Sequence, residues 1–368
     1  MTFKDMDLSK VILKSLEELN HKVPTNIQEL AIPEILKGND VLACAQTGTG
    51  KTAAFVLPII ELLMNSERKV KAEIQVLVLS PTRELAIQTR DNFRRYARYT
   101  DLQCGVVLGG VNQRSQETVL KRGVDVLVAT PGRLIDLVNQ RIVDLRNLKI
   151  LVLDEADTML DMGFIHDIRR VINFIPRERQ TLMFSATMPE SIKKLSAEFL
   201  TKPVLLQAVT KTVTVDKITQ SVYHVDSANK TELLMNILRN NGDKSTLIFT
   251  RTKHKANKLS LTLEKNNMYN EVIHGNKSQN ARIAALNNFK TGKSKILIAT
   301  DIAARGIDIT ELSQVINYEL PEMAESYVHR IGRTGRAGCV GNAISLCDRT
   351  ERRYLGDIER LIKQKLEI

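Results

Sequence analysis

The sequence contains no tryptophan, and only 4% of its 368 residues are aromatic. A surface on which successive nucleobases stack needs several aromatic side chains, so we do not expect an extended base-stacking platform.

Cysteine is also scarce. The four cysteines show neither a CxxC pair nor metal-ligand spacing, which is typical of reduced thiols in a cytosolic protein. They are Cys44, Cys104, Cys339 and Cys347.

Long hydrophobic runs are missing as well. The most apolar run, FVLPIIELLM at 55–64, is short and is interrupted by Pro58 and Glu61. Such a run cannot span a bilayer, and the N-terminal stretch MTFKDMDLSK has no apolar signal core. The sequence therefore predicts a cytoplasmic protein without a membrane role.

Acidic residues are fewer than basic ones: 42 Asp and Glu stand against 53 Lys and Arg, which gives a net charge of +11. Charge alone leaves two interpretations open, a solvated basic surface or a polyanionic partner such as nucleic acid.

The hydrophobic share of 43% is ample for buried cores. Because 368 residues exceed the size that one core usually serves, two domains are expected.

Short runs rich in Val, Ile and Leu recur along the chain, and helical patterns such as 83–98 and 188–199 alternate with them. Runs that are apolar on both faces are typical of parallel strands covered by helices. We therefore predict an α/β fold with doubly wound parallel sheets. The predicted strands are 41–45, 74–80, 124–130, 149–154 and 181–187, followed by 245–250, 270–275, 294–300, 314–320 and 342–347.

The alternation lapses in a polar, Thr-rich segment near 207–217 and then resumes. This interruption predicts two α/β domains, 1–207 and 218–368, joined by a linker at 208–217. A helix of 3.6-residue period at 354–366 closes the second domain.

The stretch ACAQTGTGKT at 43–52 follows the first predicted strand and precedes a predicted helix. Gly48 and Gly50 allow a close backbone approach, Lys51 offers a charge to phosphates, and Thr52 offers a hydroxyl to Mg²⁺. Ala45 stands where a phosphate-binding loop usually has its first glycine. A tight strand–helix turn without a ligand is the alternative.

A second acidic signal follows another buried strand. Asp154 and Glu155 come directly after the apolar residues 151–153. A carboxylate at a strand end can hold Mg²⁺ through water, and a neighbouring glutamate can polarise an attacking water. Alone, two acids after a strand are usually a solvated turn; beside the loop at 45–52 they are better interpreted as metal ligand and base.

Residues 154–157 spell DEAD, and at this point the chain resembles the DEAD-box RNA helicases over nearly its whole length. Alanine is common in that family at the position of Ala45. The other family motifs occur in order, as PTNIQ at 24–28, PTREL at 81–85, GG at 109–110, TPGR at 130–133, SAT at 185–187, QNAR at 279–282, ATDIAARGID at 299–308 and HRIGRTGR at 329–336. Asn20-His21 departs from the family's glycine-aromatic pair. Within the family, the chain most resembles the bacterial RhlE-type group.

The resemblance implies two tandem RecA-like domains and assigns residues to ATP. Gln28 would bind adenine through its carboxamide, Phe3 would lie on the adenine ring, and Asp308 would contact the ribose. Arg333 and Arg336 would act as arginine fingers from the second domain, whereas Arg330 is better interpreted as a solvated arginine. Phosphate and Mg²⁺ contacts would come from Thr47, Gly48, Thr49, Gly50, Lys51 and Thr52, with Asp154 as a water-mediated metal ligand.

Further residues are implied for coupling and for RNA. Asp157, Ser185, Thr187 and His329 would form a polar network, the alternative being satisfied core hydroxyls. Asp301 and Arg305 would line the closed interface. RNA contacts, chiefly to the sugar-phosphate backbone, would come from Thr82, Arg83, Gly109, Gly110, Thr130, Arg133, Gln279, Arg282 and Thr300.

The sequence thus predicts a monomeric, ATP- and Mg²⁺-dependent RNA helicase that unwinds short duplexes locally without sequence specificity. Ribonucleoprotein or ribosome-assembly complexes are its expected partners. A slow ATP-gated RNA clamp and a DNA translocase remain alternatives. A GTPase is disfavoured, because the nearest match to the guanine-binding NKxD motif, NKTE at 229–232, ends in Glu232.

Overall fold

The computed structural model describes residues 1–46, 48–66, 73–208, 218–242, 244–304, 312–335 and 341–366. The chain divides into two compact units, Met1–Thr210 (unit 1) and Lys211–Ile368 (unit 2). Most of the predicted linker, residues 209–217, lies outside the described part of the chain. No helix in the described ranges is long and apolar enough to cross a membrane.

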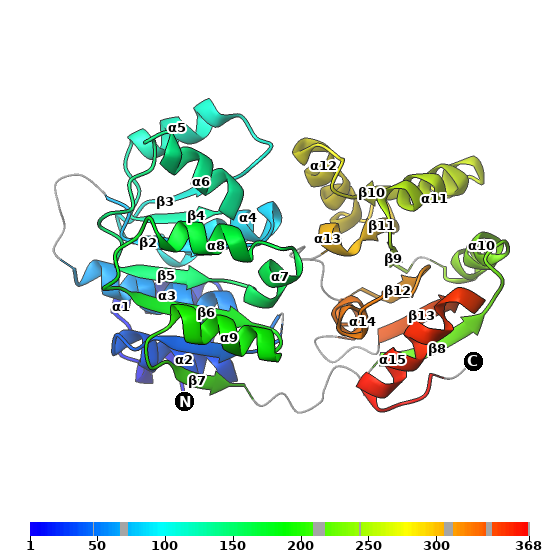
Figure 1. The fold of residues 1–368 in the computed structure, drawn as a ribbon, viewed down its shortest axis with the longest axis horizontal. Coiled ribbons are helices and arrows are strands. Elements are labelled where there is room, and N and C mark those ends of the chain that lie inside the picture. Colours follow the sequence, from blue (N-terminus) through cyan, green and yellow to red (C-terminus); the bar gives the residue numbers. More distant parts are fainter. Residues whose placement is uncertain are drawn as a thin grey trace. The chain divides into compact units, whose positions relative to one another are not determined.

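Unit 1 contains a seven-stranded sheet in the order β3-β4-β2-β5-β6-β1-β7, in which every neighbouring pair is parallel (Figure 1). The strands are β1 (Val41–Cys44), β2 (Val76–Leu79), β3 (Cys104–Val107), β4 (Val126–Ala129), β5 (Ile150–Leu153), β6 (Gln180–Ser185) and β7 (Val204–Gln207).

Helices cover both faces of this sheet. On one side lie η1 (Phe3–Asp5), α1 (Lys10–Glu18), α2 (Asn26–Leu36), α3 (Lys51–Met64) and α4 (Arg83–Tyr96), and on the other α6 (Pro131–Asn139), α7 (Ala156–Asp161), α8 (Ile165–Ile172) and α9 (Glu190–Phe199) (Figure 1). Helix α5 (Gln113–Lys121) packs near the β3 edge.

Alternate side chains of one strand enter different cores. In β2, Val76 and Val78 join the core under α1–α4, whereas Leu77 and Leu79 join the core under α6–α9. Because both faces are covered, apolar residues are favoured at nearly every position of a central strand. This explains why the continuous apolar runs predicted the central strands.

Unit 2 contains a six-stranded sheet in the order β10-β11-β9-β12-β13-β8, again parallel throughout. Its strands are β8 (Ile218–His224), β9 (Thr246–Thr250), β10 (Glu271–Ile273), β11 (Ile296–Thr300), β12 (Gln314–Asn317) and β13 (Gly341–Cys347). Its helices are α10 (Lys230–Asn240), α11 (Lys253–Lys265), α12 (Gln279–Lys290), α13 (Asp301–Ala304), α14 (Ala324–Ile331), η2 (Arg349–Glu351) and α15 (Arg352–Ile362).

The α/β fold with two doubly wound parallel sheets is confirmed, and all ten predicted strands occur. Three further strands, β3, β7 and β8, were not predicted, and each lies at the edge of its sheet. β8, with the sequence ITQSVYH, alternates buried and more exposed positions, so it lacks the continuous apolar run of a central strand. Predicted helix 354–366 corresponds to α15, which begins two residues earlier and ends at Ile362.

Candidate functional site

The described residues of the loop between β1 and α3 have features that suit an anion. Gly48 and Gly50 have φ values of +86° and +90°, a region that favours glycine. Lys51 starts α3 with its side chain only 6% exposed, and its Nζ has no hydrogen-bond partner within the described residues. A buried ammonium group without a partner is costly. The phosphates of a nucleotide, which would accept its protons, fit this position.

Gln28 fixes the end of the same loop. Its Oε1 accepts a hydrogen bond from the Thr25 backbone N–H at 2.9 Å, and its Nε2 donates to the Gly50 carbonyl at 3.1 Å. A Cβ on Gly50 would lie 2.4 Å from Gln28 Nε2, so no larger residue fits there without a shift. The carboxamide predicted to bind adenine is therefore already fixed against the phosphate loop.

The neighbouring residues predicted for adenine are differently placed. Phe3 is buried in the unit 1 core, so the structure presents its ring as a core side chain. Asn20 adopts φ +58°, a conformation that asparagine tolerates better than most residues, in the place of the family's glycine. His21 lies edge-on to Tyr96 at a ring-centroid distance of 6.0 Å. The departure at Asn20-His21 thus keeps an ordered turn and a ring contact.

Asp154 and Glu155 directly follow the carboxyl end of the central strand β5, and both are buried. Burial raises the pKa of Asp154 to about 7; the charge of Glu155 adds to the rise, and the Lys51 ammonium opposes it. Glu155 adopts φ +51°, which is strained for a residue with a side chain. Its Oε2 accepts a hydrogen bond from Thr158 Oγ1 at 3.3 Å, which orients the carboxylate.

Asp157 connects the acidic turn to the end of β6. Its Oδ2 accepts hydrogen bonds from the backbone N–H groups of Ala186 and Thr187 and from Thr187 Oγ1, each at 3.0 Å. Ser185 Oγ donates to the Thr187 carbonyl at 2.6 Å. The structure therefore brings together three of the four predicted coupling residues; the fourth, His329, belongs to unit 2.

No group of three or more His, Cys, Asp and Glu side chains in the described ranges could hold a metal ion by itself. Asp154 and Thr52 supply only oxygen atoms, which suit Mg²⁺. Mg²⁺ usually combines one or two protein oxygens with nucleotide phosphates. The residues present therefore fit a metal that arrives with its nucleotide.

The RNA-contact residues predicted in unit 1 follow the ends of β2, β3 and β4. Atoms of the Arg83 guanidinium would lie 2.4–2.7 Å from a Cβ on Gly110, so this glycine with φ +68° is needed for their close approach. Thr82 caps α4 through its hydroxyl, and Thr130 precedes α6. Arg133 donates to the Val111 carbonyl at 3.4 Å, beside the same glycine pair.

The corresponding residues of unit 2 follow a parallel arrangement. Gln279 and Arg282 are buried on one side of α12, and Thr300 ends β11. Arg282 Nη2 donates to the Ala303 carbonyl at 3.5 Å. These three residues therefore lie around the carboxyl end of β11.

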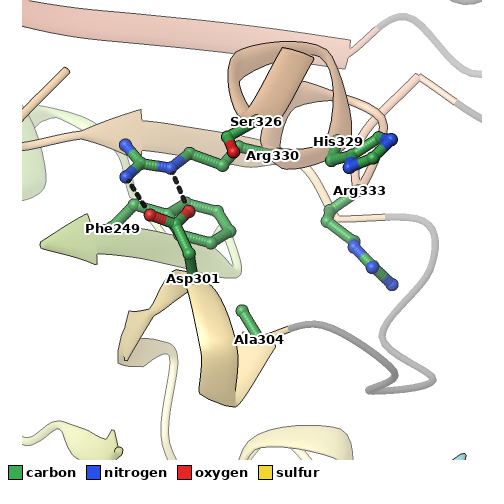
Figure 2. Close-up of a pocket in the computed structure, with 7 residues that line it drawn as sticks. All are labelled: Phe249, Asp301, Ala304, Ser326, His329, Arg330 and Arg333. Carbon is green, nitrogen blue, oxygen red and sulfur yellow. Dashed lines mark hydrogen bonds and ion pairs between the residues drawn. The ribbon is translucent and has the colours of Figure 1, made fainter. Parts of the chain in front are cut away.

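Arg330 lies in a small, open pocket of unit 2 that is lined by Phe249, Asp301, Ala304, Ser326, His329, Arg330 and Arg333 (Figure 2). Its guanidinium donates to both carboxylate oxygens of Asp301, at 2.5 and 2.7 Å, and to Asn317 Oδ1 and the Glu319 carbonyl. It also lies over the Phe249 ring, 4.9 Å from the centroid.

The prediction that Arg330 is solvated is wrong, because its side chain is only 1% exposed. A sequence signal for this burial exists: Arg330 follows Ser326 and Tyr327 at helical spacing and precedes Ile331, all of which face the interior of unit 2. His329 and Arg333 project from the same segment as Arg330 (Figure 2). The Arg330–Asp301 pair therefore holds the backbone that carries these two candidate residues.

Five residues named in the sequence analysis lie outside the described part of the chain: Thr47, Arg305, Asp308, Arg336 and Cys339.

Comparison with known proteins agrees with these features. The DEAD/DEAH box helicase family model matches residues 25–195, and the helicase conserved C-terminal domain matches residues 229–338. The chain is 42% identical to the DEAD-box ATP-dependent RNA helicase RhpA of Helicobacter pylori, covering 100% of this chain and 74% of that protein. It is 43% identical to the RNA helicase CrhR of Synechocystis sp., with the same coverage.

Among solved structures, S. cerevisiae Dbp5 bound to RNA and ADP BeF3 superimposes with a TM-score of 0.88 at 32% identity, covering 100% of this chain and 95% of that one. Two parallel-sheet units with a phosphate loop and an acidic strand end define a tandem RecA-like helicase. The chain belongs to the DEAD-box family and is an ATP-dependent RNA helicase, an RNA-dependent ATPase. The predicted family, fold and activity are thereby confirmed.

Replacing Gly50 by alanine tests the fit of the phosphate loop against Gln28. Gly50→Ala adds a backbone strain of about 1–2 kcal/mol and a Cβ 2.4 Å from Gln28 Nε2. We expect ATP affinity to fall about tenfold or more, measured by titration with a fluorescent ATP analogue. Gly38→Ala is the matched control, because Gly38 also has a positive φ, +83°, but nothing lies within 4 Å of its added Cβ. Equal ATP affinity in the two variants would contradict the prediction.

Replacing Arg330 by lysine tests its role as an anchor. Lysine keeps the charge but cannot form the planar paired contact with Asp301, so we expect unit 2 to lose about 2–3 kcal/mol of stability in denaturant unfolding. Arg349→Lys is the control, because Arg349 pairs with Asp226 at 3.5 Å on the surface, where such pairs contribute about 0–1 kcal/mol. Similar losses in both variants would show that Arg330 is no anchor.

Proposed function

We propose that unit 1 binds ATP together with Mg²⁺ through the loop that precedes α3. The observation that carries this proposal is the buried Lys51 ammonium, which has no partner within the described residues. Lys51 would hold the terminal phosphates, and the backbone of Thr47, Gly48, Thr49 and Gly50 would surround them. Bound Mg²⁺ would neutralise charge on the transferring phosphoryl group, with Thr52 and Asp154 as its protein oxygens.

Glu155 is proposed to orient and deprotonate the attacking water. Its strained backbone directs a buried carboxylate away from the ordinary helical path, and Thr158 holds one of its oxygens. Strain of this kind persists where the surrounding structure enforces it, often at active sites. The second carboxylate oxygen is left for the water.

Gln28 is proposed to select adenine with its carboxamide, with Phe3 beside the ring and Asp308 on the ribose. Arg333 and Arg336 of unit 2 would stabilise charge on the phosphoryl group of the same ATP. Asp157, Ser185, Thr187 and His329 would then couple nucleotide state to RNA state. The support for coupling is that Asp157 directly holds the SAT segment, so a change at the acidic turn reaches the end of β6.

For RNA, we propose backbone contacts that do not depend on sequence and that permit local unwinding of short duplexes. Arg83 against Gly110, and Arg133 beside Val111, offer guanidinium groups together with exposed backbone. Phosphate contacts orient a strand but do not distinguish bases. Gln279, Arg282 and Thr300 would provide the equivalent contacts in unit 2.

Several finer features complete the proposal. The predicted domains 1–207 and 218–368 would act as the two functional domains of a monomer, joined by the linker 208–217. Cys44, Cys104 and Cys347 are free thiols, which suits a cytoplasmic protein.

Ribonucleoprotein or ribosome-assembly complexes are the proposed partners. Membership of the RhlE-type group stays a prediction, since relatives of 41–43% identity have several different names.

Replacing Glu155 by glutamine tests the proposed base. The amide keeps the shape and the acceptor for Thr158 but cannot take a proton, so ATP should stay bound while RNA-stimulated hydrolysis falls by about 10²-fold or more. Steady-state ATPase with saturating RNA gives the rate, and Glu178→Gln, an exposed glutamate of unit 1, is the control. Hydrolysis at the wild-type rate would refute the role. Slow turnover already in the wild type would favour the RNA clamp.

The proposed backbone contacts predict little sequence preference. Unrelated single-stranded RNAs of equal length should bind within about tenfold of one another, or about 1.4 kcal/mol. Arg133→Ala should weaken all of them alike and reduce their salt dependence. DNA of the same sequence should stimulate ATPase less, because it lacks the 2′-hydroxyl. Titration of several RNAs and one DNA checks this; a hundredfold preference for one RNA would point to base recognition, and equal stimulation by DNA to a translocase.

A further inference from the structure

Helix α5, which packs beside the edge strand β3, buries a glutamine where a surface helix usually buries an apolar residue (Figure 1). Gln116 is only 7% exposed, and it is the one residue of α5 that is buried. The apolar residues Val119 and Leu120 of the same helix are only partly buried against the core. Burying an unpaired amide costs free energy, so a buried glutamine needs hydrogen-bond partners. The partners of this carboxamide therefore indicate what Gln116 does.

Both ends of the Gln116 carboxamide bind the turn that follows β3. Its Oε1 accepts the Leu108 backbone N–H at 2.7 Å. Its Nε2 donates to the carbonyls of Leu108 and Asn112, each at 3.2 Å, and lies 3.5 Å from the Val111 carbonyl. Leu108 directly precedes the glycine pair at 109–110, and Val111 and Asn112 directly follow it. One buried side chain therefore joins the two ends of the turn that contains both glycines.

The glycine pair itself leaves backbone donors available. Among the described residues, neither the Gly109 nor the Gly110 backbone N–H donates a hydrogen bond. Gly110 is exposed and has φ +68°, and a Cβ at this position would overlap the Arg83 guanidinium. Arg133 donates to the carbonyl of the next residue, Val111, at 3.4 Å. Backbone N–H and guanidinium groups both bind phosphate oxygens without regard to base.

A turn with two consecutive glycines needs support from outside itself. Glycine has more backbone conformations than other residues, so ordering it costs more conformational entropy. The preceding strand β3 lies at the edge of the sheet and pairs only with β4. The hydrogen bonds of Gln116 offset the entropy cost before any ligand arrives. A turn that is already ordered loses less freedom on binding, and the affinity is correspondingly higher.

We propose that Gln116 is a positioning residue for RNA. Its carboxamide holds the turn 108–112 in the conformation in which the backbone of Gly109 and Gly110 contacts a phosphate. The inference rests on the proposed RNA contacts of these two glycines. Gln116 is buried and acts through the turn, so its contribution does not depend on the RNA sequence and is separate from nucleotide binding at the loop before α3.

Replacing Gln116 by methionine tests this role, because methionine has a similar length but no carboxamide. For two unrelated single-stranded RNAs we expect binding that is weaker by about fivefold to tenfold, the loss of roughly one or two net hydrogen bonds. The full chain is titrated with Mg²⁺ and a non-hydrolysable ATP analogue present, and affinity for a fluorescent ATP analogue without RNA should stay unchanged. Gln113→Met is the matched control, because Gln113 lies on the same helix but its carboxamide donates to Glu117 and Gln140.

A double-mutant cycle separates positioning from general stability. Gly110→Ala disturbs the turn directly, because its Cβ would meet the Arg83 guanidinium at a positive φ. If Gln116 acts through the glycine pair, Gln116→Met should weaken RNA binding little further in the Gly110→Ala background, since changes within one element are not additive. Full additivity of the two losses would overturn the proposal, and so would a lower melting temperature of Gln116→Met with wild-type RNA affinity.

The same titrations distinguish this inference from the proposed function. Wild-type RNA affinity in Gln116→Met beside weakened binding in Gly110→Ala would refute the positioning role alone. Unchanged binding in both variants would refute the proposed glycine contacts as well.

Residue-resolved hydrogen exchange of the wild type tests the proposal without any substitution. The Leu108 amide should exchange slowly in the free protein, because it is bonded to Gln116. The amides of Gly109 and Gly110 should become protected only when single-stranded RNA and the ATP analogue are bound. Rapid exchange at Leu108 in the free protein, or no added protection of the glycines with RNA, would contradict the proposal.

Discussion

Burial of both faces of a parallel sheet is the constraint on which the rest of this molecule depends. In each unit helices cover both sides of the sheet, so most strand positions are apolar. The carboxyl ends of parallel strands share one edge, and there the chain leaves the core. Lys51 and Asp154 in unit 1, and Thr300 and Asn317 in unit 2, lie at or just beyond such ends. The parallel arrangement of buried strands therefore brings residues from distant motifs to the same edge of each sheet.

Near these strand ends, the buried charged side chains fall into two kinds: those paired inside the protein, which stabilise the fold, and those that would need a ligand. Arg330 uses four donors on partners inside its own unit, and Lys230 reaches Asp348, Glu351 and the Tyr318 carbonyl, so both serve the fold. Lys51 is equally buried but has no partner among the described residues, and Asp154 has its pKa raised to about 7. A buried ammonium without a hydrogen-bond partner and a buried carboxyl with a raised pKa are groups that a phosphate or a metal would satisfy.

Sequence patterns predicted ten strands, most of which are central and largely apolar, because burial on both faces leaves a nearly continuous apolar signal. They did not predict the edge strands β3, β7 and β8, although they predicted the edge strand β10. An edge strand has one neighbour, and β8 (ITQSVYH) carries polar residues at its more exposed positions. Motifs located the phosphate loop and the acidic pair, but not the bond from Gln28 to the Gly50 carbonyl or the burial of Arg330 by Asp301. Those features join segments far apart in sequence, and local periodicity does not encode which distant side chain completes a buried one.

The contacts of Asp157 indicate how a chemical change at one strand end can reach another. Asp157 belongs to the same turn as the strained Glu155, and its carboxylate holds two backbone N–H groups and one hydroxyl of the SAT segment. Hydrogen bonds to a carboxylate are stronger than those between neutral groups. If the turn shifted, breaking these hydrogen bonds would cost free energy, so the proposed coupling has a physical route from the turn to the end of β6. Because β6 pairs in register with β1, which leads into the phosphate loop, the acids, the SAT segment and the loop form one connected unit rather than three separate motifs.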